Sequence, residues 1–186
     1  MTRRAALLAV IVALSAATLA HAQLVEPPSE AGDFSLEETS GQTRTLSSVR
    51  GRVVIVFYED RDHTSVNHAF KETLHRFVID NHLQQQTTTY AIADVHGIDG
   101  IVRDMARGAI RTIASRYGIQ ILLDWDGVMR RAPFSLRGSE ANVALIDRQG
   151  RMRWRHAGAV GEAERTSFFR TFRQLLREPA PAPAAP

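Results

Sequence analysis

A nine-residue segment, EDRDHTSVN at 59–67, carries the side chains of this sequence that are best suited to chemistry. It follows an apolar run at 53–58, and the C-terminal ends of buried strands are where open α/β sheets bind ligands. An imidazole beside carboxylates can transfer protons near neutral pH. The candidate binding residues of this region are Tyr58, Glu59, Asp60, Arg61, Asp62, His63 and Asn67.

Three interpretations of this segment are open from the sequence. In the first, Thr64 or Ser65 caps the following helix, and Asp62 is stabilised by the positive end of the helix dipole. In the second, the helix N-terminus binds an anion or a small polar ligand, with Arg61 and His63 adding charge. In the third, Asp62, His63 and Ser65 act in hydrolysis, although neighbours on one turn seldom orient as nucleophile, base and orienting group.

The same segment also contains possible metal ligands. Glu59, Asp60, Asp62 and His63 would suit a hard cation or zinc. Their spacing, however, matches no established ligand pattern. We therefore predict no metal site and no cofactor.

Hydrophobic periodicity predicts the elements that position the segment. The run at 53–58 is continuous and rich in β-branched residues, which is typical of a strand covered on both faces. The order β-β-β-α-β-α-β-β-α predicts an α/β domain with a mixed sheet and helices on both faces. The predicted strands are two around Ser40-Gly41, then 53–58, 87–95 and 119–124, and two around 148–150 within 142–156.

Three helices are predicted from apolar residues at helical spacing. Gly118 is a typical C-terminal residue for the second of them. The residues expected on the buried faces are Phe70, Leu74, Phe77 and Val78; Val102, Met105, Ala109, Ile113 and Tyr117; and Phe168, Phe169, Phe172, Leu175 and Leu176.

Two repeating patterns predict surfaces. His68, His75 and His82 are seven residues apart, so on a helix they form one stripe but lie about 10 Å apart along the axis, too far to share one ion. We interpret the stripe as solvated, with a pH-sensitive partner surface as the alternative.

Arginines also alternate with larger side chains near the C-terminus. They are expected on an exposed hairpin face or, alternatively, on a surface that binds acidic groups. The alternating residues are Arg151, Arg153 and Arg155 with Met152, Trp154 and His156, and the possible neighbours are Arg130, Arg131 and Arg137.

The N-terminus predicts export. Two arginines precede an apolar run at 5–19, and Ala20-His21-Ala22 matches a signal-peptidase site, so we expect cleavage before Gln23. The run is shorter than the roughly 20 residues of a spanning helix, and no membrane span is expected after cleavage. The predicted organisation is a signal peptide at 1–22, a lead-in at 23–31, one domain at 32–177 and a Pro/Ala-rich tail at 178–186.

Charge and cysteine content limit the function. Loss of Arg3 and Arg4 lowers the formal charge from +3 to +1, which gives no basis for nucleic-acid binding. The chain has no cysteine, so it has neither disulfides nor thiol chemistry.

The sequence resembles the thioredoxin-fold redoxins, a group that includes alkyl hydroperoxide reductases, thiol-specific antioxidants and exported thiol–disulfide reductases. The resemblance covers about 33–176 and rests on DFSLEETSGQTRTLSSVRGRVVIVFYED, LLDWDGVMRRA and VALIDRQGRMRWRHAG in that order. It implies a thioredoxin-like fold with the active site at the turn after 53–58.

The resemblance fails at the residues that perform redoxin chemistry. Alignment with a Cys-x-x-Cys loop places Asp62 and Ser65 at the cysteine positions, and alignment with a peroxiredoxin loop places Asn67 at the reactive one. Ala141 occupies the position of the family's cis-proline, which makes it a further binding candidate, and Pro133 is too far upstream. Because that chemistry needs a thiolate, we predict no catalytic residues of this kind.

The sequence therefore predicts an exported, periplasmic or secreted, cysteine-less redoxin-like protein. Its expected role is non-enzymatic binding of a protein partner or a small polar or anionic ligand at the former active-site face. The alternative is an enzyme of non-thiol chemistry at 62–67, using Asp62, His63 and Asn67.

Overall fold

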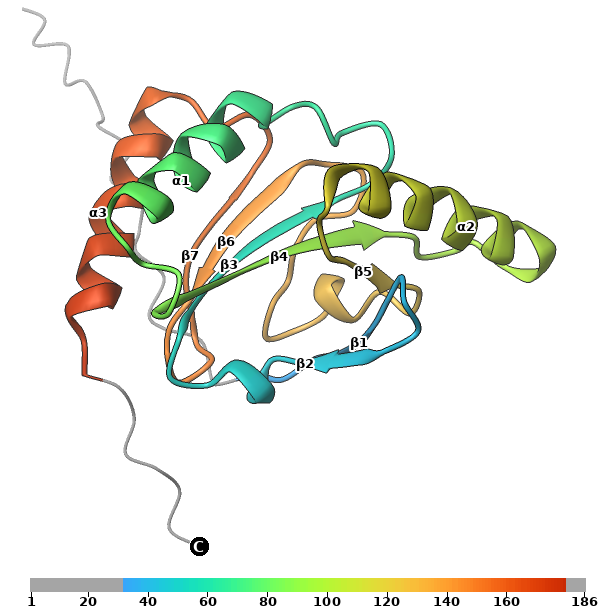
Figure 1. The fold of residues 1–186 in the computed structure, drawn as a ribbon, viewed down its shortest axis with the longest axis horizontal. Helices are drawn as coiled ribbons and strands as arrows, with labels where there is room; N and C mark the ends of the chain where they lie inside the picture. The colour runs from blue at the N-terminus through green and yellow to red at the C-terminus, as the bar shows by residue number, and fades with distance from the viewer. Residues whose placement is uncertain (1–31, 180–186) are drawn as a thin grey trace, which may run out of the picture.

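The computed structural model describes residues 32–179, shown as a ribbon in Figure 1. The predicted signal peptide, the lead-in and all but two residues of the predicted tail lie outside this range. Within 32–179, no helix combines the length and the apolar character needed to cross a membrane.

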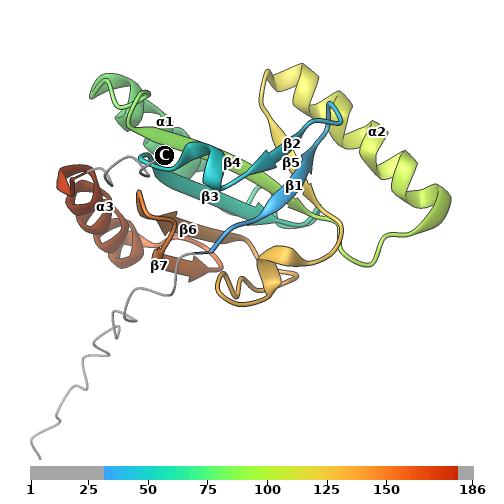
Figure 2. The ribbon, with the colours of Figure 1, turned by 90° about the horizontal axis from the view of Figure 1, so that it is seen from below.

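A seven-stranded mixed sheet forms the centre of the structure, in the order β2-β1-β5-β4-β3-β6-β7. The predicted N-terminal hairpin is confirmed, because β1 pairs antiparallel with β2 and then with β5 (Figure 2). The strands are β1 (Ser35–Glu38), β2 (Thr43–Thr45), β3 (Val53–Glu59), β4 (Thr87–Asp94), β5 (Ile121–Asp124), β6 (Asn142–Ile146) and β7 (Met152–Ala157).

Strand β3 lies in the interior of the sheet, as its continuous apolar run predicts. It is parallel to β4 and antiparallel to β6, and every one of its residues is buried. Alternate β3 side chains enter two different cores, with Val54, Val56 and Tyr58 on one face and Ile55 and Phe57 on the other. The strand before the candidate site is therefore fixed from both sides.

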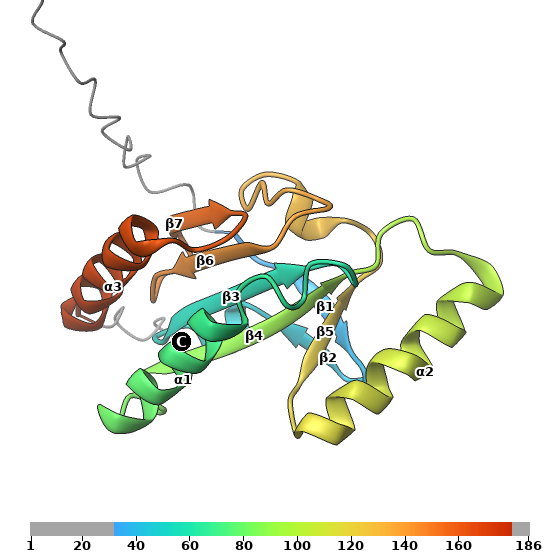
Figure 3. The ribbon, with the colours of Figure 1, turned by 90° about the horizontal axis from the view of Figure 1, so that it is seen from above.

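Helical segments cover both faces of the sheet, as predicted, but the three α-helices share one face (Figure 3). Ala93 of β4 pairs with Glu59, so it faces the same side as Phe57, and α2 packs on Ala93 and Leu123 there. The opposite face is covered by two short 3-10 helices and loops. The helices are α1 (His68–Asp80), α2 (Gly100–Tyr117), α3 (Glu162–Arg177), η1 (Ser47–Val49) and η2 (Val128–Arg130).

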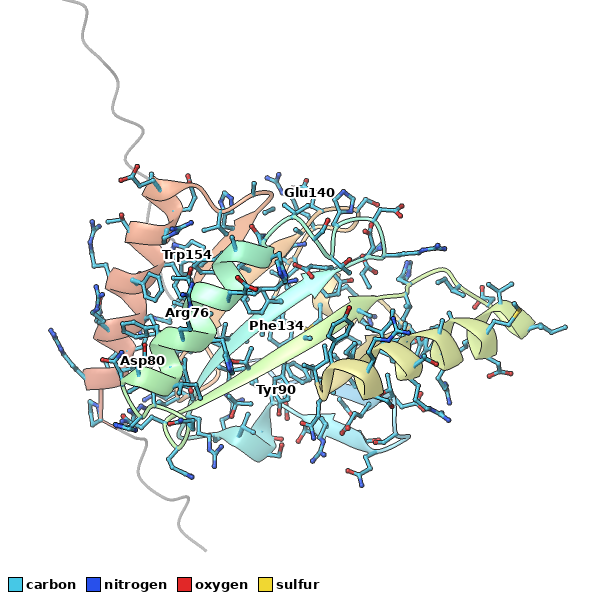
Figure 4. All side chains as sticks on the ribbon, turned by 45° about the horizontal axis from the view of Figure 1, so that its top comes forward. Arg76, Asp80, Tyr90, Phe134, Glu140 and Trp154 are labelled. Carbon is cyan, nitrogen blue, oxygen red and sulfur yellow. The ribbon has the colours of Figure 1, made fainter. Side chains whose placement is uncertain are left out.

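Helices α1 and α3 share an aromatic core. Phe70 of α1 lies edge-on to Phe168 of α3, with ring centroids 5.0 Å apart. Phe168 also meets Trp154 of β7 edge-on at 5.2 Å. Figure 4 shows Trp154 beside these helices and Tyr90 and Phe134 at the middle of the sheet; the latter two belong to the opposite core. The predicted inner faces of α1 and α3 are thus confirmed.

The predicted inner face of α2 is wrong. Its expected core residues are exposed, and the buried side chain of the helix is Ala114. Two arginines occupy the inner side instead, because the guanidinium groups of Arg103 and Arg107 stack on Trp125, 4.5 and 5.8 Å from the ring centroid. The predicted end at Gly118 is confirmed, since that residue is left-handed with φ 62°.

The predicted helix cap is also wrong. The chain turns through 61–67 before α1 begins, so the N-cap is Asn67 and neither Thr64 nor Ser65. Asn67 makes no side-chain cap hydrogen bond, because its amide is used elsewhere.

The two repeating patterns are modified by local geometry. The three histidines are exposed, but His82 lies beyond the end of α1. In β7, a bulge leaves Arg153 without an opposite residue, so that Met152 and Trp154 enter different cores. The predicted strict alternation of an arginine face and an apolar face is therefore broken.

Candidate functional site

The candidate site lies at the carboxyl edge of the sheet, defined here by the ends of β3, β4 and β5 at Glu59, Asp94 and Asp124. These strands are parallel neighbours, so their C-terminal ends meet. The start of β6 and the end of β7 reach the same edge, because Asn142 pairs with both Tyr58 and Ala157.

Asp60 organises the turn that leaves β3. Its Oδ1 accepts hydrogen bonds from the backbone N–H groups of Asp62 and His63, at 3.0 and 3.1 Å. The same oxygen lies 2.6 Å from Nδ1 of His63. The histidine ring is therefore held by Asp60 and not by Asp62.

The predicted hydrolytic group is not assembled. Arg61, Asp62 and Ser65 are exposed, and no side-chain hydrogen bond within residues 32–179 joins Ser65 to His63. The turn brings Asp60 and His63 together, but it leaves them without a bonded nucleophile.

Asn67, at the position of the reactive thiol of the redoxin pattern, is a structural tie. Its side chain is buried, with 3% of the residue exposed. Its Nδ2 donates to the carbonyl of Gly158 at 3.1 Å, and its Oδ1 accepts from the backbone N–H of Val160 at 2.9 Å. The amide thus fastens the start of α1 to the loop between β7 and α3 and is not available to a ligand.

Glu59 forms a buried ion pair with Lys71, the single lysine of the sequence. Its Oε2 lies 2.5 Å from Nζ, which also donates to the carbonyl of Thr64 at 3.0 Å. Oε1 has no partner in the described chain, and burial raises the pKa of Glu59 despite the nearby ammonium. The signal in the sequence is that Lys71 is the single lysine of the chain and follows Glu59 by twelve residues, at the start of the next helix.

A second buried charge lies at the end of β4. The side chain of Asp94 is 1% exposed, and its Oδ2 accepts from Nη2 and Nε of Arg130 at 2.6 and 3.1 Å. Nε of Arg130 also lies 3.3 Å from the Tyr58 hydroxyl, whose pKa is raised above its ordinary value by burial. Tyr58, predicted as a binding residue, is fully buried, so its role here is to support Arg130.

Asn142 performs a similar structural role at the start of β6. Its Oδ1 accepts from the backbone N–H of Arg137 at 2.9 Å, and its Nδ2 donates to the carbonyls of Tyr58, Arg137 and Glu140. Ala141 beside it is buried. The cis peptide bond of the described chain joins Ala132 and Pro133, eight residues before Ala141.

A small cavity opens beside these residues. Its volume is about 290 Å³, and it lies between the loop that precedes β6 and the end of β7. No carboxylate lines it. The lining residues are Ser135, Leu136, Arg137, Asn142, Arg155, His156 and Ala157.

A larger hollow of about 760 Å³ lies along α3 and just beyond it, from Thr166 to Pro179. It lies at the other end of the helix from Asn67 and its partners, so it is no part of the candidate site. No three side chains of the kinds that bind metal ions cluster within 32–179.

Comparison with known proteins identifies the fold. No family model and no curated protein matches the chain. A thioredoxin-like superfamily protein is similar with TM-score 0.60 and 20% identity, covering 82% of this chain and 99% of that one. A protein assigned as the thiol:disulfide interchange protein DsbE of Chlorobium tepidum is similar with TM-score 0.59 and 17% identity, covering 82% of this chain and 99% of that one. The exposed lipoprotein thioredoxin Etrx1 of Streptococcus pneumoniae is similar with TM-score 0.55 and 16% identity, covering 77% of this chain and 100% of that one.

These similarities extend over nearly the whole length of each solved structure. At 16–20% identity they identify the fold alone. The sequence supplies no cysteine at the turn after β3 or elsewhere. The protein therefore has a thioredoxin-like fold and is cysteine-less.

Proposed function

We propose that this protein is an exported binding protein that recognises a carboxylate-bearing ligand at the former active-site face. The observation that carries the proposal is the cavity of about 290 Å³ beside Asn142, which is lined by basic side chains and by no acidic one. It adjoins the position where the redoxin pattern places its cis-proline. Ligand binding at this edge would reuse the geometry of the fold without its chemistry.

The charge and size of the cavity define the class of ligand. Arg137 supplies a planar guanidinium, which suits the two oxygens of a carboxylate. His156 adds an imidazole, held by a 3.0 Å contact between Nε2 and the carbonyl of Ala159. The volume lies near the lower limit of small-molecule sites, so it fits a small acid or one acidic side chain.

Glu140 modulates this charge. Its carboxylate lies 3.5 Å from Nη1 of Arg137, and Figure 4 shows it at the same end of the molecule as the turn before α1. A bound carboxylate would compete with Glu140 for the guanidinium.

Calorimetric titration with glutarate tests the proposal. We expect saturable binding that Arg137→Gln and His156→Gln each weaken. Glu140→Gln should strengthen it, by up to about fivefold, since exposed ion pairs contribute up to about 1 kcal/mol. The matched control is Arg151→Gln, which changes an exposed arginine directly before the first residue of β7, whereas the cavity lies at the last residues of that strand. This variant should bind glutarate as the wild type does.

Two further titrations identify the source of the carboxylate. Glutaramide, which is uncharged, should not bind. A short peptide with a free C-terminal carboxylate distinguishes a peptide ligand from a free small acid, and its amidated form is the control. Equal binding of glutarate by the wild type and the Arg137 and His156 variants would contradict the proposed site.

Export is a separate part of the proposal and rests on the sequence of residues 1–22. N-terminal sequencing of protein recovered from outside the cytoplasm should begin at Gln23. Recovery of the intact N-terminus would contradict cleavage.

One contact favours the alternative of a non-thiol enzyme. The Asp60–His63 pair at 2.6 Å resembles the orienting group and base of a hydrolase. An ester hydrolysis rate above that of buffer, lost in His63→Gln, would support that alternative over binding alone.

A further inference from the structure

Helix α2 carries a row of apolar side chains that face away from the fold. We call this row, with Ala109 at its centre, the α2 stripe. The exposed fractions are 82% for Ile101, 59% for Val102, 69% for Met105, 49% for Ile113 and 68% for Tyr117. Folded monomers seldom leave a contiguous apolar patch of this kind uncovered.

The inner side of α2 fixes this orientation. Arg103 and Arg107 stack on Trp125, and Arg107 pairs with Glu37 at 2.9 Å. Nε of Arg111 donates to the carbonyl of Thr39 at 3.0 Å. These contacts hold three of the four arginines of α2 against the body of the fold, so the helix cannot turn its stripe inward without losing them.

The stripe has the spacing of a helix-packing surface. Ile101, Met105, Ala109, Ile113 and Tyr117 are each four residues apart, and such rows form the ridges through which helices most commonly pack. The row extends over about 24 Å at 1.5 Å per residue. Figure 1 shows α2 projecting at one side of the molecule, where a partner can reach it.

We propose that α2 pairs antiparallel with α2 of a second copy of this chain, about a two-fold axis at Ala109. Within the stripe, the row of five residues spaced by four is symmetric about that residue. Met105 and Ile113 lie four positions on either side of it, and Ile101 and Tyr117 lie eight positions on either side. An isologous interface needs this property, because each copy presents the same patch to the other. Gly108 and Ala109 at the centre allow the two backbones to approach closely.

The charges beside the stripe match the same arrangement. Asp104 directly precedes Met105 and Arg116 directly precedes Tyr117, so both lie beside the row on its same side. Neither has an ion-pair partner within residues 32–179. In an antiparallel pair, Arg116 of each copy lies near Asp104 of the other, which gives two symmetric ion pairs.

A lipid surface fits the stripe less well. Helices that lie on membranes carry their lysines and arginines along the exposed polar flanks. Here most of the arginines of α2 are bound to the fold, and Asp104 lies on a flank. A second copy matches both the apolar row and the charges.

Sedimentation equilibrium over a wide range of protein concentration tests the pairing. We expect the wild type to form a dimer that dissociates on dilution. Met105→Glu should raise the dissociation constant by at least about 100-fold, because the buried charge enters a two-fold interface twice. Ile79→Glu, at an exposed apolar residue of α1 (43%), is the control on another surface and should leave the dimer unchanged. Circular dichroism establishes that each variant is folded.

Charge exchange separates this geometry from unspecific association. Asp104→Arg should weaken the dimer, and adding Arg116→Asp to the same chain should restore it. A monomer at every concentration would overturn the proposal, as would a dimer unaffected by Met105→Glu. Association of a monomer with anionic phosphatidylglycerol vesicles through the stripe would assign α2 to a lipid surface instead and would also overturn it.

Discussion

At the scale of single residues, the carboxyl edge is occupied largely by structural polar groups. Asn67 and Asn142 each join segments that are distant in sequence, and the pairs Glu59–Lys71 and Asp94–Arg130 neutralise buried carboxylates. Because buried polar groups are stable only when they are bonded, these contacts determine which side chains remain for a ligand. On the β6–β7 side, the neighbouring cavity presents the basic side chains of Arg137 and His156.

Replacing Asn67 tests its role as a tie. Asn67→Ala removes two hydrogen bonds and leaves the buried N–H of Val160 without its acceptor, so we expect a loss of about 1–3 kcal/mol in the free energy of unfolding. Urea denaturation measures this loss. Ser65→Ala, at an exposed neighbour, should be nearly neutral. Equal stability of the two variants would show that Asn67 does not fasten α1.

Glu59 should give stability a specific pH dependence. Its pKa is raised by burial, so between its ordinary and raised values the folded state binds the proton that the unfolded state has lost. The contribution of Glu59 to stability is therefore present below the ordinary pKa and is lost as the pH rises through the raised value. Glu59→Gln keeps an acceptor for Lys71 and should lack this loss.

The difference between the two proteins isolates this effect from that of other carboxylates. Urea denaturation of wild type and Glu59→Gln across a series of pH values should show the variant gaining relative stability as the pH rises. Asp62→Asn, at an exposed carboxylate, should show no such trend. A relative gain by the wild type would reverse the sign and contradict the burial argument.

The residues that could and could not be foreseen differ in the range of their contacts. The turn at 59–67 and its position after a buried strand follow from local sequence. The partners of Asn67 lie 91 and 93 residues away, and no local pattern specifies such a contact. For the same reason the sequence does not predict the contact between Arg130 and Asp94 or the basic cavity, although the alternative of an acid-binding surface names Arg130 and Arg137 as possible neighbours.

At the scale of elements, periodicity predicts the existence of each element better than its environment. The central strands were predictable because continuous β-branched runs occur in strands covered on both faces. The position of helix α2 was also predictable, but the side of the helix that packs on the fold was not. Either its apolar stripe or its arginines, stacked on a tryptophan, could face inward. Periodicity locates the stripe without saying what covers it, and the stems of Arg103 and Arg107 cover Trp125 as apolar groups do.

The aromatic core between α1, α3 and β7 should contribute strongly to stability. Phe168 is fully buried and meets Phe70 and Trp154 edge-on. Phe168→Ala should therefore lower the free energy of unfolding by about 3–5 kcal/mol through lost burial and a residual cavity. Phe168→Leu, which keeps most of the volume, should cost clearly less in the same denaturation experiment. Equal costs would show that the cavity does not determine the effect.

At the scale of the whole molecule, the fold is that of thiol-dependent proteins but the side chains are not. The turn after β3 still leads into a helix, but polar groups such as Asn67 at this turn stabilise the fold and carry out no thiol chemistry. The absence of sulfur from the whole sequence other than in methionine removes the nucleophile on which exchange and peroxide reduction depend.

Two activity measurements test this conclusion. The protein should neither accelerate the reduction of insulin by dithiothreitol nor consume hydrogen peroxide faster than buffer, because no thiolate can form. A thioredoxin with an intact Cys-x-x-Cys motif is the positive control for the first assay. Turnover above the buffer rate in either assay would show that the fold supports redox chemistry by another route.

The two borders of the sheet have a consequence for assembly. One border is β2, which is three residues long, and the other is β7, where a bulge at Arg153 interrupts the pairing and Arg155 is exposed. Short strands, bulges and charged side chains hinder the addition of a strand from another molecule. Growth into fibrils by edge-to-edge stacking is thereby disfavoured at both ends, and higher-order association must use surfaces other than the backbone.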